Sequence, residues 1–286
     1  MPVAVTFGAA NAIYHKKTQR SNAENPIKSR HKNKLMKHLK IFAALCCAAV
    51  LFAACDKSNE PKNDSNDNSN ITPSNPDEEV TGDTENGHNY VDLGLPSGTL
   101  WATCNVGATA PEEYGDYFAW GETETKTTRY NWSTYKWCNG DYNNLTKYNT
   151  YSIFGTVDNK TTLDPEDDAA VVNWGGKWRM PTDDEWMELR ETCTWTWTEG
   201  YNGTDKNGYE VKSNANGNTI FLPAAGYRED DSLDNAGDSG DYWSSSLCTL
   251  SSVGTHSAWG VYFGPGRLYR GYGGRYFGIS VRPVFK

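Results

Sequence analysis

The chain has 286 residues and a formal net charge of −9, and the charge is unevenly distributed. Up to Cys55 there are nine lysines and arginines and a single acid. The remainder carries 18 basic and 35 acidic residues, and therefore a net charge of −17. Because a body this acidic repels nucleic acid, we expect no nucleic-acid partner.

The first segment of the chain has the pattern of an export signal. Lys37 and Lys40 precede 14 apolar residues, 41–54, which is shorter than the roughly 20 residues that cross a bilayer. The stretch LFAAC at its end resembles the lipobox of bacterial lipoproteins, which implies cleavage before Cys55 and a lipid anchor on its sulfur. We therefore predict an exported, membrane-anchored protein of the outer membrane or cell surface. A plain secretory signal is the alternative.

Composition divides the chain into four parts. Residues 1–35 are predicted to be a non-structural upstream extension and residues 36–54 the lipoprotein signal peptide. Residues 55–87, rich in Asn, Asp, Ser and Pro, are predicted to be the lipidated cysteine and a disordered tether. All 11 tryptophans lie at or beyond Trp101, so residues 88–286 are expected to form one folded domain.

Four cysteines fall within this domain: Cys104, Cys138, Cys193 and Cys248. In an exported protein they can form disulfides in any of three pairings, or each can be a small buried hydrophobic residue. No CxxC motif occurs, so we expect no zinc site.

Two helices are expected in the middle of the domain. In DPEDDAAVVNWGG, Asp164 is the expected N-cap, Pro165 the first helical residue and Gly175 the stop signal. In MPTDDEWMELRETC, Thr182 and Glu185 have the spacing of a capping box.

Most other segments have the pattern of strands. Early strands are expected at 90–95, 99–107 and 117–122, and further strands at 194–198, 208–213, 219–228, 240–247, 257–263 and 276–284. Asn216-Gly217 predicts a hairpin turn between two of them. Two short helices with mostly antiparallel sheets give an α+β fold.

Several of these segments together resemble a known family. YVDLGLPSGTLWATCNVGA, GGKWRMPTDDEW, NTIFLPAAGYR, GDYWSSS and GISVRPV are similar to the Fibrobacter succinogenes major paralogous domain. KWRMPTDDEW and GISVRPV also resemble the formylglycine-generating enzyme superfamily. This resemblance implies a C-type-lectin-like fold whose final strands and their loops share one face.

The catalytic chemistry of that superfamily is not expected here. The resemblance implies a copper-binding cysteine pair near the C-terminus, but no cysteine follows Cys248, so we predict that the chain is not an enzyme. Residues 244–246 are three serines that we expect in a strand rather than in a hydrolase site. No cofactor is expected. Calcium held by the acidic loop is a minor alternative, with candidate ligands Asp230, Asp231, Asp234, Asp238 and Asp241. A formylglycine-generating-type enzyme and an unrecognised hydrolase remain the alternative functions.

The C-terminal region instead has the composition of a binding surface. The 45 residues after Asp241 contain no acid and are rich in Arg, Tyr, Trp and Gly, residue types that antibodies use for recognition. We assign ligand binding to six residues of this region that fall where the family pattern is loose: Trp259, Tyr262, Arg267, Tyr269, Arg270 and Tyr272. An ordinary surface loop is the alternative for them. By contrast, Ala258, Phe263, Gly278 and Val281 are expected in the core, and Arg282 is expected to be the buried partner of a carboxylate.

The expected partner is an anionic glycan or a protein surface, because the region is locally positive. C-type-lectin-like proteins that are diversified by retroelements vary this same region, and their ends, from YWSSS to VRPV, resemble the end of this chain. The resemblance implies that residues 256–276 form a programmable binding face, and a non-diversified paralogue is the alternative. A structural adhesion module is a further alternative. Replacing Tyr269, Arg270 and Tyr272 together by alanine is expected to abolish binding and to leave thermal stability nearly unchanged.

Overall fold

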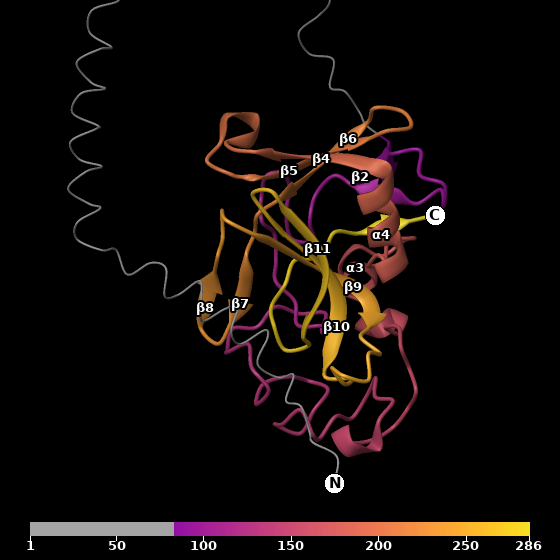
Figure 1. Cartoon of the computed structure of the whole chain (residues 1–286), viewed down its shortest axis with the longest axis vertical. Helices are drawn as coiled ribbons and strands as arrows, with labels where there is room; N and C mark the ends of the chain where they lie inside the picture. Colours follow the sequence, from indigo (N-terminus) through magenta and orange to yellow (C-terminus); the bar gives the residue numbers. More distant parts are fainter. Residues whose placement is uncertain (1–82) are drawn as a thin grey trace, which may run out of the picture. The chain divides into compact units, whose positions relative to one another are not determined.

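The computed structural model describes residues 83–286 (Figure 1). The predicted extension, signal peptide and lipidated Cys55, and nearly all of the predicted tether, lie outside the described residues. Among residues 83–286, no helix combines the length and apolar character needed to cross a membrane.

One sheet joins the two ends of the domain. Its strand order is β1 (Thr84–Glu85), β2 (His88–Asp92), β3 (Leu100–Ala102) and β12 (Val284–Phe285). All its pairings are antiparallel, and Val284 pairs with Trp101. The first strand begins four residues before the predicted domain start at His88, within the segment assigned to the tether.

A second antiparallel sheet has the order β11 (Arg267–Gly274), β10 (Ser257–Gly264) and β9 (Gly240–Leu247). A third contains β4 (Cys193–Thr198), β5 (Gly208–Ser213) and β6 (Thr219–Pro223), with the predicted hairpin turn at Asn216-Gly217. A separate hairpin pairs β7 (Tyr227–Glu229) with β8 (Ser232–Asp234). The molecule therefore consists mostly of antiparallel sheets, as the α+β prediction requires.

The second predicted helix is confirmed as α4 (Asp183–Thr192), with the capping box between Thr182 and Glu185. The first is divided into a 3₁₀ turn, η2 (Pro165–Asp167), and α3 (Ala169–Trp174). Asp168 rather than Asp164 is the N-cap of α3. Its buried carboxylate accepts bonds from the amides of Ala170 and Val171, and also from that of Met180. Two further 3₁₀ turns are η1 (Ser152–Phe154) and η3 (Tyr201–Gly203).

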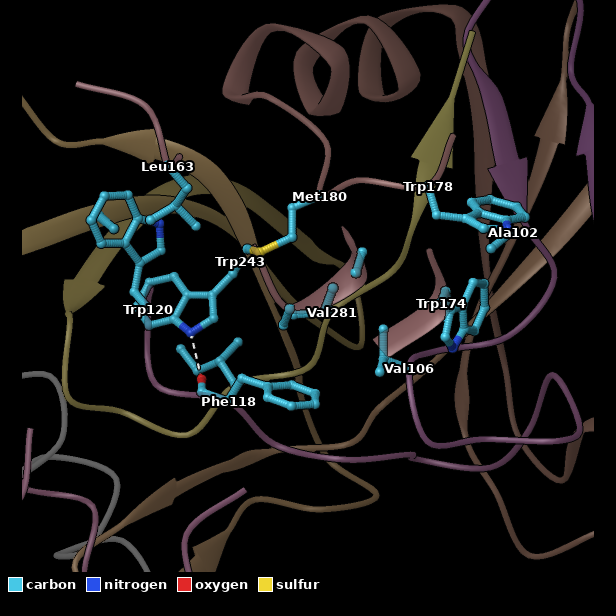
Figure 2. Close-up of a cluster of buried hydrophobic side chains, with 14 of the residues drawn as sticks. Ala102, Val106, Phe118, Trp120, Leu163, Trp174, Trp178, Met180, Trp243 and Val281 are labelled. Carbon is cyan, nitrogen blue, oxygen red and sulfur yellow. Dashed lines mark hydrogen bonds between the residues drawn. The ribbon is translucent and has the colours of Figure 1, made fainter. Parts of the chain in front are cut away.

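Tryptophans form much of the core (Figure 2). In the cluster that Figure 2 shows, Trp243 from β9 donates its indole N–H to the carbonyl of Phe118 at 2.9 Å. Trp120 donates to the carbonyl of Ser244 at 2.8 Å. Each indole thus fills core volume and also satisfies a backbone acceptor of a segment that lies beside it.

Two strand predictions were wrong, and one strand was not predicted. Residues 117–122 form only the bridge Phe118–Ile279, because the chain turns at Gly121, which has φ +78°. Residues 278–280 form isolated bridges to Arg228, Phe118 and Tyr242 instead of one strand, and Val284 begins β12. Residues 267–274, for which no strand was predicted, form the edge strand β11.

The four cysteines of the domain are free, so none of the three disulfide pairings forms. Cys138, Cys193 and Cys248 are buried, and burial raises the pKa of each thiol. These three residues therefore act as small hydrophobic side chains in their neutral form.

Candidate ligand-binding site

The β10–β11 pairing separates the six predicted binding residues onto two faces. Residues that pair across strands share a face, and neighbours along a strand alternate. Trp259 pairs with Tyr272, and Val261 pairs with Arg270. This is the α4 face, where Val261 and Phe263 pack in one hydrophobic cluster with Trp186 of α4.

The other three residues lie on the opposite face, where Tyr262 pairs with Tyr269 and Gly264 pairs with Arg267. We call this the Trp243 face, because Ala258 and Tyr262 pack there in the cluster of Trp243. The six residues therefore do not share the single binding face that was expected of them. A strand with alternating side chains displays at most half of them on one side.

On the α4 face, Trp259, Arg270 and Tyr272 contact one another. The Arg270 guanidinium lies 4.0 Å from the centre of the Trp259 ring. The Tyr272 ring meets that of Trp259 edge to face, with centroids 5.8 Å apart. These contacts hold the indole between a cation and an aromatic edge.

Arg270 is also bound to the beginning of α4. Its Nε donates to both carboxylate oxygens of Asp183 at 3.0 Å, and Nη2 donates to one of them. This bond raises the pKa of Arg270, so the guanidinium is charged at every relevant pH. Charge-assisted contacts of this kind are among the strongest between side chains, so they fix β11 against the helix.

The helix itself is held in place by two further contacts. The Asp183 amide donates to Ser246 Oγ at 3.2 Å, which satisfies one of the free N–H groups of a helix N-terminus. The Trp186 indole donates to the carbonyl of Trp243 at 3.1 Å. Both partners belong to β9, so α4 and the β9–β10–β11 sheet form one rigid support.

An open hollow of about 320 Å³ lies beside this support. Segment 161–162 contributes to the lining because it lies beside the end of β9, where Thr162 bridges to Ser246 and the Leu247 amide donates to the carbonyl of Thr161 at 2.8 Å. The lining comes from four parts of the chain and consists of Thr161, Thr162, Asp183, Asp184, Ser246, Leu247, Thr249 and Trp259.

Much of this lining has unused hydrogen-bonding capacity. The side chains of Thr161, Thr162, Asp184 and Thr249 are exposed, and within the described part of the chain they form no hydrogen bond. A rigid indole therefore stands beside a group of available hydroxyls and a carboxylate. Six of the eight lining residues are polar, so the hollow offers a ligand many hydrogen-bonding groups beside one indole.

On the Trp243 face, Tyr262 has a packing role. Its buried hydroxyl has no hydrogen-bond partner within residues 83–286, and its ring lies against β11 where a Cβ at Gly271 would be 2.7 Å away. Asp241, its neighbour on β9, is also buried, and burial raises its pKa to about 7. Tyr269 is 49% exposed, and Arg267 is exposed as well.

Two of the arginines near the C-terminus are entirely interior. Arg275 binds the Tyr135 hydroxyl and the carbonyls of Lys147, Tyr148 and Thr255. Arg282 is buried as predicted, but its partners are the side-chain carbonyl of Asn105 and three backbone carbonyls rather than a carboxylate. These positive charges therefore stabilise the fold and do not reach the surface.

The other chemical candidates do not assemble into a site. Ser244 and Ser245 are buried in β9, where the Ser244 hydroxyl donates to the carbonyl of Trp259. Asp230, Asp231 and Asp234 lie in or next to the β7–β8 hairpin, and Asp231 pairs with Arg129. Over residues 83–286, no group of three or more His, Cys, Asp or Glu side chains is arranged to hold a metal ion.

Of the six residues predicted from the sequence, Trp259 lines the hollow, whereas Arg270 and Tyr272 contact Trp259 without lining it. Asp183 and Asp184 are typical first-turn residues of a helix, and Thr161 and Thr162 lie in a segment with no motif, distant from Trp259 in the sequence. No protein-family model matches the chain, and neither a curated protein nor a solved structure does.

Proposed function

We propose that this protein is an exported lipoprotein, anchored through Cys55, whose folded domain binds a ligand without catalysis. The proposal assigns the chain to the Fibrobacter succinogenes major paralogous domain, with a C-type-lectin-like fold. The order of the resembling segments supports it, as do the antiparallel sheets with two short helices.

The ligand site proposed here is the hollow beside Trp259, together with the neighbouring Arg270 and Tyr272. The observation that carries the proposal is the fixed indole of Trp259, which Arg270 covers at 4.0 Å while Asp183 binds Arg270. An aromatic ring that is already held in place loses little entropy when a ligand contacts it.

The same contacts remove the reason to expect a negatively charged ligand. The expectation of an anionic partner depended on positive charge in this region, but Arg270 is neutralised by Asp183, and Arg275 and Arg282 are buried. A glycan or a protein surface remains the proposed partner, without a requirement for negative charge.

Binding of the full chain to glycan arrays and to bacterial and host cells tests this function. Trp259→Ala is expected to abolish the binding that the parent shows. Tyr269→Ala is the matched control, because this aromatic lies on the same hairpin but on the Trp243 face. Equal binding by both variants would refute the assignment of the site, and no binding by the parent would favour a structural adhesion module.

A further inference from the structure

We infer that the hollow beside Trp259 binds an uncharged sugar ring. The inference rests on the proposed function and specifies its ligand class. It depends on three properties of the lining, which are its charge, its aromatic surface and its hydroxyl groups.

The charge of the lining excludes an anionic ligand. Asp183 and Asp184 are the charged residues of the lining, and no Lys or Arg is among them. The guanidinium of Arg270, which lies over the Trp259 ring, already bonds to both carboxylate oxygens of Asp183. An anion in the hollow would therefore face the exposed carboxylate of Asp184 without a compensating cation.

The aromatic surface suits a sugar ring. One side of a pyranose ring presents only C–H groups, which are apolar and carry slight positive charge, and the face of an indole is apolar and electron-rich. Trp259 is partly exposed and lines the hollow, while Arg270 and Tyr272 hold its orientation. The volume of about 320 Å³ is at the small end of the range for ligand pockets, roughly 300–1,000 Å³, and suits a small ring.

The polar groups match the remaining edge of such a ring. A sugar presents several hydroxyls, each of which both donates and accepts. Thr161, Thr162 and Thr249 offer hydroxyls that can do the same, and Asp184 offers a carboxylate that can accept from two neighbouring hydroxyls. Because these groups come from separate segments that β9 brings together, they can contact different edges of one ring.

The test measures binding of the full chain to neutral hexose oligosaccharides and to uronic-acid oligosaccharides of the same linkage, by calorimetry. The parent is expected to bind at least one neutral probe and to bind its uronic-acid counterpart at least about tenfold more weakly, which corresponds to about 1.4 kcal/mol. Trp259→Ala is expected to lose at least about tenfold in affinity for the neutral probe, and Tyr269→Ala is expected to leave it unchanged.

Asp184→Asn separates charge from hydrogen bonding, because the amide keeps the shape and one acceptor but loses the negative charge. We expect it to weaken neutral-sugar binding by about threefold to tenfold and to reduce the discrimination against the uronic acid. Near-ultraviolet circular dichroism of each variant confirms that the tryptophan-rich core is intact.

The remaining outcomes overturn the inference in different ways. Tighter binding of the uronic acid, or of a cationic amino sugar, than of the neutral probe would refute the uncharged ligand. If Trp259→Ala abolishes binding of a protein ligand but does not change sugar binding, the inference is refuted and the proposed function stands. If Trp259→Ala changes neither sugar binding nor protein binding, both the inference and the proposed site are refuted.

Discussion

Arg270→Ala is expected to destabilise the fold, although Arg270 lies on an edge strand. The substitution removes the bonds from the guanidinium to Asp183 and the cation–π contact with Trp259. Asp183 then remains at the beginning of α4 with only 9% of its side chain exposed and without its cation. The cost arises from this desolvated carboxylate rather than from the arginine itself.

Two limits bracket the magnitude. Breaking a fully buried ion pair costs about 3–5 kcal/mol, whereas exposed pairs contribute about 0.2–1 kcal/mol. The Arg270 side chain is 42% exposed and Asp183 is nearly buried, so we place the loss in unfolding free energy at about 2 kcal/mol. For a domain of this size, that lowers the melting temperature by about 4–8 °C.

A double-mutant cycle measured by urea denaturation tests this origin. Asp183→Asn removes the charge that Arg270 compensates, so Arg270→Ala should cost less in that background. We expect a coupling energy of about 1–2 kcal/mol. The reasoning would be refuted if Arg270→Ala lowers the unfolding free energy by less than about 0.5 kcal/mol, or if the losses of Arg270→Ala and Asp183→Asn add without coupling in the double variant. The expectation that the triple alanine variant of Tyr269, Arg270 and Tyr272 leaves stability unchanged is therefore replaced by a measurable loss.

Three further predictions concern ionisable groups of the interior. Burial raises the pKa of Asp241 to about 7, so its protonated form stabilises the fold fully at about pH 4, and this contribution is lost as the pH rises through 7. Asp241→Asn should therefore raise the unfolding free energy by up to about 4 kcal/mol at pH 8 and hardly change it at pH 4, and equal effects at both pH values would contradict this. Burial lowers the pKa of His256, as does the nearby charge of Arg275, so the fold favours the neutral imidazole. The unfolding free energy of the parent should therefore fall relative to that of His256→Phe as the pH drops below about 6.5, and unfolding free energies that run parallel from pH 8 to 5 would contradict this. Asp168→Ala should cost about 2 kcal/mol in chemical denaturation, because it removes the cap of α3 and the acceptor for the Met180 amide, whereas a change under about 0.5 kcal/mol would show that the cap is dispensable.

Features of the fold that depend on local rules could be predicted from the sequence. The capping box of α4 needs only Thr182 and Glu185, and the hairpin at Asn216-Gly217 needs only its turn residues. The division of the other helix could not be predicted this way. Asp168 caps α3 while it also accepts from Met180, a residue brought close only by the tertiary structure.

The strand β11 was missed because its glycines serve a packing purpose. Gly271 and Gly273 lie where the side chain of Tyr262 crosses, and a Cβ at either position would stand 2.7 Å from it. Glycine is normally unfavourable in a strand, so the pattern RLYRGYGG gave no strand signal.

The candidate site could be predicted only in part for a similar reason. Trp259, Arg270 and Tyr272 stand out in composition, but their separation from Tyr262, Arg267 and Tyr269 follows from the register of two strands. The partners from α4 and from segment 161–162 are supplied by long-range contacts that β9 makes with both.

The most direct test of ligand binding at the hollow compares the parent, Trp259→Ala and Tyr269→Ala in one titration against a neutral oligosaccharide that the parent binds. We expect Trp259→Ala to lose at least about tenfold in affinity while Tyr269→Ala matches the parent. Equal affinities of the parent and Trp259→Ala, or a loss confined to Tyr269→Ala, would contradict a ligand site on the α4 face.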